Sequence, residues 1–482
     1  MLGKALTTAA AGNAAGAGLY VEEVFSTYLY TGNGSTQTIT NDIDLDGEGG
    51  LVWIKHRTIG YNHALFDTAR GATKRLQSNG TSAEDIQPTS LTAFGSTGFT
   101  LGADSSGVGV NINGGAHASW TFRKAPKFFD VVTYVGSSAP QTISHNLGSV
   151  PGCIIVKDTT AASDWYVYHR GIDATAPEDY RIYLNQTAVR NNSTVGWADT
   201  APTETEFTVG SGLDTTGNTY VAYLFAHNDG DGIFGENGDQ DIIKCGSYNG
   251  SDHRSEEIVD LGFEPQFVLV KNVNSAEDWR MTDTMRGMPV ATDSRNFDPN
   301  TADAENGPGA APNATATGFY FPGTGAPYNE SGSTFIYIAI RRGPMKTPES
   351  GTEVFNPVVY TGDNTSDRLI DTSLITDAIF VKERNDTGVA GMHVASRLTD
   401  KYYLKTASTA AETSSTIAFL TPAFDSMSGV FVGNDPGAKL NSDTTSNNHV
   451  AHAFRRAPGF FDVVAYDGND TAGHEISHSL GV

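Results

Sequence analysis

Hydrophobic and polar residues alternate along short segments of this chain, and turn residues separate the segments. Residues 220–225 and 335–340 are rich in aromatic and β-branched side chains, whereas 32–34, 47–50 and 114–115 are built from Gly, Asn and other turn-forming residues. A period of two predicts β-strands, and Gly-rich or Asn-rich clusters predict turns between them. No stretch of twelve or more residues after position 25 has a 3.6-residue apolar period, so the pattern predicts an all-β protein.

A set of motifs recurs in the same order along the chain. The tripeptide Tyr-x-Gly opens each repeat at intervals of 104 to 114 residues, beginning at Tyr30, Tyr134, Tyr248, Tyr360 and Tyr466. In the first four repeats, an apolar strand follows and ends in Lys55, Lys157, Lys271 or Lys382. A segment that ends near Arg, a Phe-containing strand and a closing strand with alternating residues complete each repeat. Repeats of this length are the size of a domain, so each predicts one folded unit.

Short strands with regular turns over about 100 residues predict one β-sandwich per repeat, of jelly-roll or lectin-like type. The expected units are 25–126, 127–228, 241–346 and 347–458, with an acidic Gly-rich linker at 229–240 and the start of a fifth repeat at 459–482. We call the four units 1 to 4, and we expect them to form an extended rod or array. Because 476–481 repeats the motif at 143–148, we also expect the natural protein to continue beyond this point.

Residues 1–24 differ from the repeats. They contain an Ala/Gly-rich tract at 9–17, and they are too polar for a good secretory signal peptide because of Thr7, Thr8 and Asn13. The segment is expected to anchor the chain to a partner and to become ordered only on assembly.

Composition excludes several classes of protein. The 482 residues carry 31 Lys and Arg against 55 Asp and Glu, a formal net charge of −24. Nucleic-acid binding needs a basic surface, so no nucleic-acid partner is expected. No apolar run reaches the roughly 20 residues of a membrane helix, so no membrane insertion is expected. Two cysteines cannot cross-link four units, and the 53 glycines are consistent with many turns.

Taken together, the motifs resemble the repeat domains of virion structural proteins of marine tailed phages, which are usually labelled tail fibres or tail-associated proteins. The likeness rests on Tyr-x-Gly, on Ile-Ser-His-x-Leu-Gly at 143–148 and on Asp-Trp-Tyr-Val-Tyr-His-Arg at 164–170, and it extends from Leu19 onward. The third unit lacks the Ser-His segment, and the fourth has Met392-His393 where the second and third have Trp. The resemblance implies a virion role and a β-sandwich, and it transfers no catalytic residue.

The acidic linker contains a candidate metal site. Carboxylates separated by glycines can wrap a hard cation such as Ca²⁺, which takes six to eight oxygen ligands. The candidate ligands are Asp229, Asp231, Glu236, Asp239 and Asp241. The alternative, which the spacing favours, is a solvated linker with no cofactor.

One strand offers a candidate ligand site. In 165–170, alternation places Tyr166, Tyr168 and Arg170 on one face of the strand, where they could stack on a sugar. The alternative, which we favour, is that they pack in the sandwich core or against another unit. No catalytic residue is expected, because no strand-turn-helix nucleophile motif is present.

The function expected from the resemblance is a phage tail fibre or tail-associated adhesin, made in the host cytoplasm and located in the virion tail. Other virion proteins are the expected partners of the N-terminal segment, and a host cell-surface glycan is the expected ligand. Fibres are usually homo-oligomers, and a trimer is the first expectation by analogy. The chain is not expected to be an enzyme. The alternatives are a capsid or neck decoration protein without a host ligand and, less favoured, a surface-glycan hydrolase.

Overall fold

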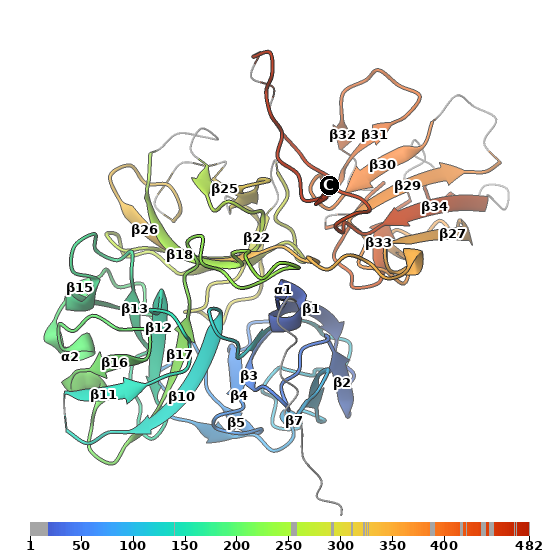
Figure 1. Cartoon of the computed structure of the whole chain (residues 1–482). Coiled ribbons are helices and arrows are strands. Elements are labelled where there is room, and N and C mark those ends of the chain that lie inside the picture. The colour runs from blue at the N-terminus through green and yellow to red at the C-terminus, as the bar shows by residue number, and fades with distance from the viewer. Residues whose placement is uncertain are drawn as a thin grey trace, which may run out of the picture.

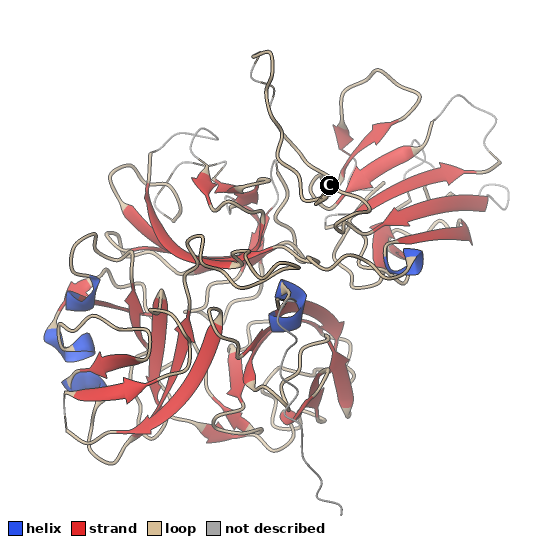
Figure 2. Ribbon diagram, viewed as in Figure 1, coloured by secondary structure: helices blue, strands red, loops and turns tan. Residues whose placement is uncertain are grey.

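The computed structural model describes residues 18–481, except 139, 252–257, 291–293, 310–311, 322, 324, 326, 386–390, 415–417, 421, 435–439, 443–447, 467 and 469. Nearly all of its regular structure is strand, so the all-β multi-sandwich prediction is confirmed (Figure 2). The helices among the described residues are single turns: α1 (Val21–Val24), α2 (Thr194–Trp197) and the 3-10 turns η1 (Pro177–Asp179), η2 (Ser211–Leu213) and η3 (Gly351–Glu353).

The main sheet of every unit has the same antiparallel order, in which the first strand pairs with the closing strand, the closing strand with the third and the third with the fourth. In that order the strands are β1 (Phe25–Thr31), β9 (Ala116–Arg123), β3 (Gly50–His56) and β4 (Ala64–Asp67) in unit 1; β10 (Phe129–Val135), β17 (Thr219–Phe225), β12 (Cys153–Asp158) and β13 (Tyr166–His169) in unit 2; β18 (Ile243–Asn249), β26 (Thr334–Arg341), β20 (Pro265–Asn272) and β21 (Arg280–Asp283) in unit 3; and β27 (Phe355–Thr361), β34 (Asn448–Phe454), β29 (Ala378–Glu383) and β30 (His393–Ser396) in unit 4. Units 2 and 4 extend this sheet with β14 (Tyr180–Tyr183), β15 (Asn191–Asn192), β31 (Tyr402–Lys405) and β32 (Thr413–Ser414).

The second sheet of each unit is smaller and lies across the core from the main sheet. It pairs β2 (Gln37–Thr40), β8 (Gly98–Leu101) and β7 (Leu91–Gly95) in unit 1; β11 (Gln141–Ser144) and β16 (Glu206–Val209) in unit 2; β19 (Val259–Asp260), β25 (Gly318–Tyr320) and β24 (Asn313–Ala314) in unit 3; and β28 (Arg368–Asp371) and β33 (Gly429–Val432) in unit 4. Two short pairs complete the strands, β5 (Lys74–Arg75) with β6 (Asp85–Ile86) and β22 (Ser294–Asn296) with β23 (Asn306–Gly309).

The Tyr-x-Gly motif closes each sandwich from inside. The tyrosine hydroxyl donates to a backbone carbonyl 79 or 80 residues later in the chain: Tyr30 to Val110 (2.6 Å), Tyr134 to Leu213 (2.9 Å), Tyr248 to Tyr328 (2.7 Å) and Tyr360 to Leu440 (2.7 Å). The glycine lies so close to a backbone carbonyl that a Cβ would overlap it, as at Gly32 against Ile112, Gly136 against Thr215, Gly250 against Glu330 and Gly362 against Ser442. We call this arrangement the tyrosine lock.

One continuous hydrophobic core runs through units 1, 2 and 3. At its centre, the ring centroids of Phe122 and Phe25 are 5.0 Å apart, and those of Phe122 and Phe129 of unit 2 are 5.6 Å apart. Phe267 of unit 3 lies 5.5 Å from Phe25. The three units therefore form a closed group, which we call the ring, and the expected extended rod is wrong for them. The physical reason is that their main sheets are apolar on both faces, and the second face is buried only when units pack together.

Buried lysines connect the units of the ring, and each lysine reaches its neighbour in the same direction around the ring. They are the lysines that end the third strands, and each donates to a backbone carbonyl of another unit: Lys55 to Ala302 of unit 3 (3.2 Å), Lys157 to Thr81 of unit 1 (3.3 Å) and Lys271 to Thr187 of unit 2 (3.1 Å). Each unit contacts one neighbour in this way, and the third contact completes the circle. The three units are therefore related by an approximate three-fold rotation. Burial lowers the pKa of each of these lysines to about 8.

Unit 4 is set apart from the ring, at the upper right of Figure 1, and it has a hydrophobic core of its own. The other end of the described chain belongs to the ring instead. Val21 and Val24 of α1 are fully buried in the ring core, although the sequence placed them in a separate N-terminal segment. The Ala/Gly-rich tract of that segment lies outside the described residues, as do all of residues 1–17.

Candidate functional site

A groove of about 570 Å³ lies where unit 4 meets units 1 and 3. Its walls include α1 and β1, residues of the segment 342–348 that leads from unit 3 into unit 4, and residues 455–457, which follow β34. We call it the junction groove. Charged side chains from units 1, 3 and 4 line it, so the junction groove is the first candidate for a functional site.

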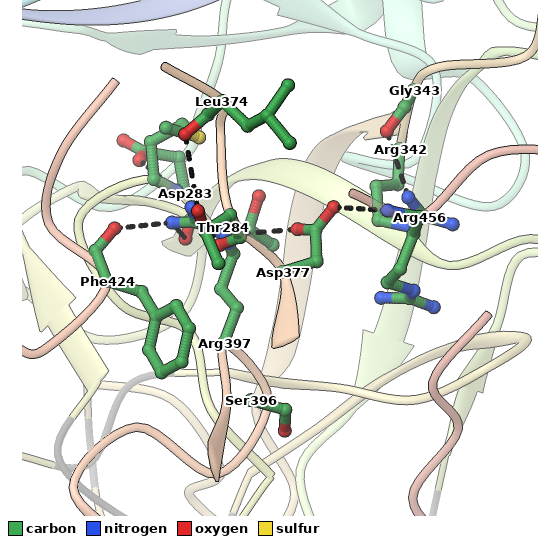
Figure 3. Close-up of polar contacts among 12 residues, drawn as sticks. Asp283, Thr284, Arg342, Gly343, Leu374, Asp377, Ser396, Arg397, Phe424 and Arg456 are labelled. Atoms are coloured by element: carbon green, nitrogen blue, oxygen red, sulfur yellow. Dashed lines mark hydrogen bonds and ion pairs between the residues drawn. The ribbon is translucent and has the colours of Figure 1, made fainter. Parts of the chain in front are cut away.

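Arg456 links unit 4 to unit 3 through a buried ion pair. Its two terminal nitrogens donate to both carboxylate oxygens of Glu264, at 2.8 and 2.6 Å, and its Nε donates to Asp462 at 2.6 Å. Its backbone N–H donates to Asp377 at 2.8 Å (Figure 3). Such two-pronged, charge-assisted contacts fix both distance and orientation, so they set how the two units meet.

Arg397 makes the second set of contacts in the groove (Figure 3). Its Nε donates to Asp377 at 3.2 Å, and its terminal nitrogens donate to the backbone carbonyls of Phe424 (2.7 Å) and Thr376 (2.9 Å). Asp377 therefore receives one arginine side chain and the backbone of Arg456. Both arginines lie just beyond the ends of strands, Arg397 after β30 and Arg456 after β34, so the strand order of the sandwich brings them together.

The charged side chains in the groove shift one another's pKa values. Burial alone would lower the pKa of Arg456, but the Glu264 carboxylate outweighs it and the pKa is raised. Burial and the neighbouring Arg456 lower the pKa of Arg342. Burial would raise the pKa of Asp462, but Arg456 more than offsets this and lowers it. Asp462 is thus held ionised by Arg456, which suits an ion-paired contact between units more than proton transfer.

Arg57 forms a second set of ion pairs, which joins units 1, 3 and 4. Its guanidinium donates to Glu305 of unit 3 at 2.7 and 2.9 Å and to both oxygens of Asp425 of unit 4 at 2.7 Å. Breaking a buried pair by removing one partner typically costs about 3–5 kcal/mol, because a charge is left uncompensated. Ion pairs of Arg57 and Arg456 thus hold unit 4 to the ring, and Ile375 and Met427 of unit 4 pack against the edge of the ring core.

A second groove, of about 850 Å³, lies between units 2 and 3. Two of the three predicted ligand residues, Tyr168 and Arg170, line it. Arg170 is exposed, whereas the Tyr168 side chain is 4% exposed and packs edge-on against Trp197. The third residue, Tyr166, packs against Tyr183, with 5.0 Å between ring centroids, and does not line the groove. The favoured packing role thus fits both tyrosines, and Arg170 is left facing the groove.

Polar groups surround Arg170 in this groove, which we call the unit 2–3 groove. Asp173 and Arg190 form an ion pair of 3.2 Å on its wall, and the Arg190 guanidinium also lies 4.9 Å from the centre of the Tyr180 ring. His227 lines the same groove, and burial, followed by the charge of Arg170, lowers its pKa to about 4. At neutral pH the groove therefore offers two guanidinium groups, a carboxylate and a neutral imidazole, a set that can bind hydroxyl-rich or anionic ligands.

The acidic segment is organised by lysines and backbone groups. Asp231 accepts from Lys127 at 2.9 Å, and Asp241 accepts from the backbone N–H groups of Gly230 and Gly232 at 2.8 and 2.9 Å. Within the described residues, which include 229–241, no three His, Cys, Asp or Glu side chains are placed to hold a metal ion. The structure therefore does not bring together the candidate ligands Asp229, Asp231, Glu236, Asp239 and Asp241. The segment is also more than a solvated linker, because Phe234 is fully buried in the ring core.

Pairs of basic residues follow the closing strands of units 3 and 4. In these pairs, Arg342 and Arg456 both reach Glu264 of the same chain, and their side chains are 11% and 3% exposed. Sequence reasoning missed the buried pairs Asp67–Arg70 and Asp283–Arg286, each joined at 2.6 Å. The available signal was the spacing of three residues between Asp and Arg in both repeats, with the Asp as the last residue of the fourth strand.

Comparisons with known proteins add one finding. Residues 21–344 match the model of a family described as "Domain of unknown function (DUF7483)". The match begins at the first residue of α1 and ends two residues before the end of unit 3, so it spans the ring and leaves unit 4 outside. No curated protein matches the chain. Across the described part of the chain, no helix has the length and apolar character needed to cross a membrane.

Proposed function

We propose that this protein, which belongs to the DUF7483 family through the residues of the ring, is a phage virion structural protein of the tail, a fibre or tail-associated adhesin. The family match itself gives no function, and the proposal starts from the repeat motifs. Its sandwich units present surfaces to the host cell. The observation that carries the proposal is that one sandwich design is used four times, and that three copies share a continuous core. A repeated unit with buried, ion-paired junctions makes a stiff platform, which a structural protein exposed on a particle requires.

The unit 2–3 groove supports the attachment role. Arg170 is exposed there, next to the buried aromatic ring of Tyr168 and the paired Asp173 and Arg190. A sugar can be bound by weak polar contacts of this kind, and several copies of a weak site on one particle raise avidity by roughly 10²–10⁴. The proposed ligand class is a host cell-surface glycan.

The experiment that tests the location is labelling of phage particles with an antibody raised against unit 4. Label on the tail, seen by electron microscopy, is the expected result. Label on the capsid would replace the proposal with a decoration protein, and particles without label would reject a virion role.

The attachment role is tested by binding of the purified chain to host cells. Arg170→Ala should lower binding several-fold, since it removes the exposed charge of the groove. The matched control is Lys74→Ala, which removes a half-exposed charge of unit 1 that lies outside both grooves. Equal binding by the two variants would remove the unit 2–3 groove from the proposal.

A further inference from the structure

The three contacts between units of the ring use equivalent positions, but the contact between units 2 and 3 carries different side chains. In the other two contacts, the last residue of the fourth strand is an Asp, which pairs with an Arg three residues later: Asp67 with Arg70 and Asp283 with Arg286. Both Asp side chains also accept a hydrogen bond from a side chain of the neighbouring unit. A buried ion pair therefore lies where unit 1 meets unit 2 and where unit 3 meets unit 1.

Unit 2 has neither residue of this pair. His169 ends its fourth strand, opposite Cys153 of the third strand, just as Asp67 lies opposite Leu51 in unit 1. Three residues after His169 comes Ile172, which is fully buried. The His169 Nε2 lies 3.0 Å from a carbonyl oxygen of unit 3, and burial lowers the pKa of this imidazole to about 3, so it is neutral at ordinary pH. The contact between units 2 and 3 thus has no ion pair at these positions.

A third equivalent position has the opposite charge at the same contact. It holds Glu84 in unit 1, Arg190 in unit 2 and Glu305 in unit 3. The backbone N–H of each donates to the residue two positions after a ring lysine of a neighbouring unit, which is Thr159, Val273 and Arg57, respectively. The two glutamates accept hydrogen bonds from the arginines of the buried pairs, at 3.1 and 3.2 Å. Arg190 therefore places a cation where the other two contacts place a carboxylate.

Asp173 compensates the charge of Arg190, whereas Arg170 has no such partner. Asp173 pairs with Arg190 at 3.2 Å through one oxygen, and its other oxygen accepts from the backbone N–H groups of residues 175 and 176. Among the described residues, none pairs with the Arg170 guanidinium or accepts a hydrogen bond from it, and the side chain is exposed. Burial raises the pKa of the Cys245 thiol of unit 3, and the charge of Arg170 opposes this rise, so the guanidinium lies near the unit 3 wall of the groove. In a chain of net charge −24, this groove is a local site for an anion.

The unit 3 wall of the groove supplies neutral polar groups. Ser247 and Asn249 of β18 and Thr334 of β26 line it, and the first two are exposed. The Thr334 hydroxyl donates to the side-chain oxygen of Asn249 at 3.3 Å. The Asn249 amide nitrogen and the Ser247 hydroxyl have no partner within the described part of the chain, so both are available to the hydroxyl groups of a ligand. A Cβ on Gly171 of unit 2 would lie 2.9 Å from the Cβ of Ser247, which shows that the two walls are in close contact at this point.

We propose that the unit 2–3 groove selects an acidic saccharide: a carboxylate or sulfate group binds Arg170, and sugar hydroxyl groups bind Ser247 and Asn249. A guanidinium can donate two parallel hydrogen bonds to a carboxylate or to a tetrahedral oxyanion, and a neutral sugar has no group that uses this charge in the same way. The inference rests on the proposed attachment function for the statement that the ligand is a glycan. The selectivity for an anion follows from the side chains of this one contact, which differ from those of the other two.

The test is calorimetric titration of the purified chain of residues 1–482 with three oligosaccharides of equal length. An oligogalacturonate carries carboxylates, a heparin fragment carries sulfates, and a maltooligosaccharide is neutral. At least one acidic oligosaccharide should bind about tenfold or more tightly than the neutral one, and its affinity should fall as NaCl is added. The comparison of the two acidic compounds identifies the preferred group. Failure of both to bind at millimolar concentration, or equally tight binding of the neutral one, would overturn the proposal.

Two variants with opposite expected effects locate the site. Arg170→Ala should weaken binding of the acidic oligosaccharide about tenfold, because it removes the charged partner. Asp173→Asn should tighten it several-fold, because it releases Arg190 from its ion pair while the amide oxygen still accepts from the backbone. The matched control Lys74→Ala removes a cation of unit 1 outside the groove and should leave the affinity unchanged. Equal affinities of Arg170→Ala and the control, or an affinity of Asp173→Asn that is not raised, would overturn the assignment.

The same measurements separate this inference from the proposed function. A chain that binds the acidic oligosaccharide through Arg170 but does not bind host cells keeps the anion-selective groove and loses the attachment role. Binding to host cells that Arg170→Ala lowers, without binding of either acidic oligosaccharide, keeps the attachment role and overturns the acidic ligand.

Discussion

The closing strands β17 of unit 2 and β34 of unit 4 have the same partners within their sheets but different surroundings. Both lie between the first and third strands of their unit, and in both units the tyrosine lock is in place. Yet β17 is buried on both faces, and β34 on one. The tyrosine lock stabilises the sandwich in both units. What differs between them is the outer face of the main sheet, which is buried against other units in the ring and not in unit 4.

The largest expected effect is on the shared core of the ring. Phe122→Ala removes a ring that contacts phenylalanines of all three units, and truncation of a buried Phe typically costs about 3–5 kcal/mol. Because the core is continuous, we expect the unfolding of units 1, 2 and 3 to shift together, measured by urea denaturation. Loss of unit 1 alone would show that the three units are independent.

Nearly as large is the effect of removing a buried charge of the ring. Asp283 accepts from Arg286 at 2.6 Å and from the indole N–H of Trp120 of unit 1 at 3.0 Å. Asp283→Ala leaves the fully buried Arg286 without this partner and should cost about 3–5 kcal/mol of unfolding free energy. Unit 4 has Ser396 at the equivalent position, where Ser396→Ala should change stability little. Similar losses at both sites would contradict the contrast between ring and unit 4.

A smaller effect is expected in the pH dependence of the ring lysines. The pKa of Lys157 is lowered by burial to about 8, so between pH 8 and 10.5 the unfolded chain keeps a proton that the folded chain has released. Stability from this group therefore rises with pH over that window, by up to about 1.4 kcal/mol per unit. From pH 7.5 to 10, the wild type should gain roughly 1–3 kcal/mol more than Lys157→Met. Parallel pH profiles would show that Lys157 is not perturbed.

The smallest expected effect is the loss of one tyrosine-lock hydrogen bond, and it should be equal in the ring and in unit 4. Tyr134→Phe and Tyr360→Phe each delete one lock hydrogen bond, and each should cost about 1–2 kcal/mol. The measurement is the shift in urea midpoint of the ring transition for Tyr134→Phe and of the unit 4 transition for Tyr360→Phe. Equal losses would show that the lock is common to ring and unit 4. A loss confined to Tyr134→Phe would mean that unit 4 closes in another way.

Much of the fold follows from the sequence because it depends on local spacing. The repeat of Tyr-x-Gly and the alternating closing segments predict the strands and the sandwich units. The tyrosine lock could not be predicted in this way, since Tyr30 donates to a carbonyl 80 residues away. The sequence also contained a sign of the ring, because 220–225 and 335–340 are apolar on both faces and so need cover on both.

The candidate sites were harder to predict because they depend on which units touch. Lys55 contacts Ala302, 247 residues away in the chain, and Arg456 contacts Glu264, 192 residues away. No local motif encodes either pair. The acidic segment shows the opposite error: Asp231 and Asp241 look like ion ligands in sequence, but a lysine and backbone N–H groups occupy their oxygens.

The central claim, one cooperative ring beside a separately folded unit 4, is tested most directly by native-state hydrogen exchange at increasing denaturant. The account predicts that amides of β9, β17 and β26 exchange through one opening with a single free energy, and that amides of β34 exchange through a different one. Three separate free energies for β9, β17 and β26, or a common one for all four strands, would contradict it.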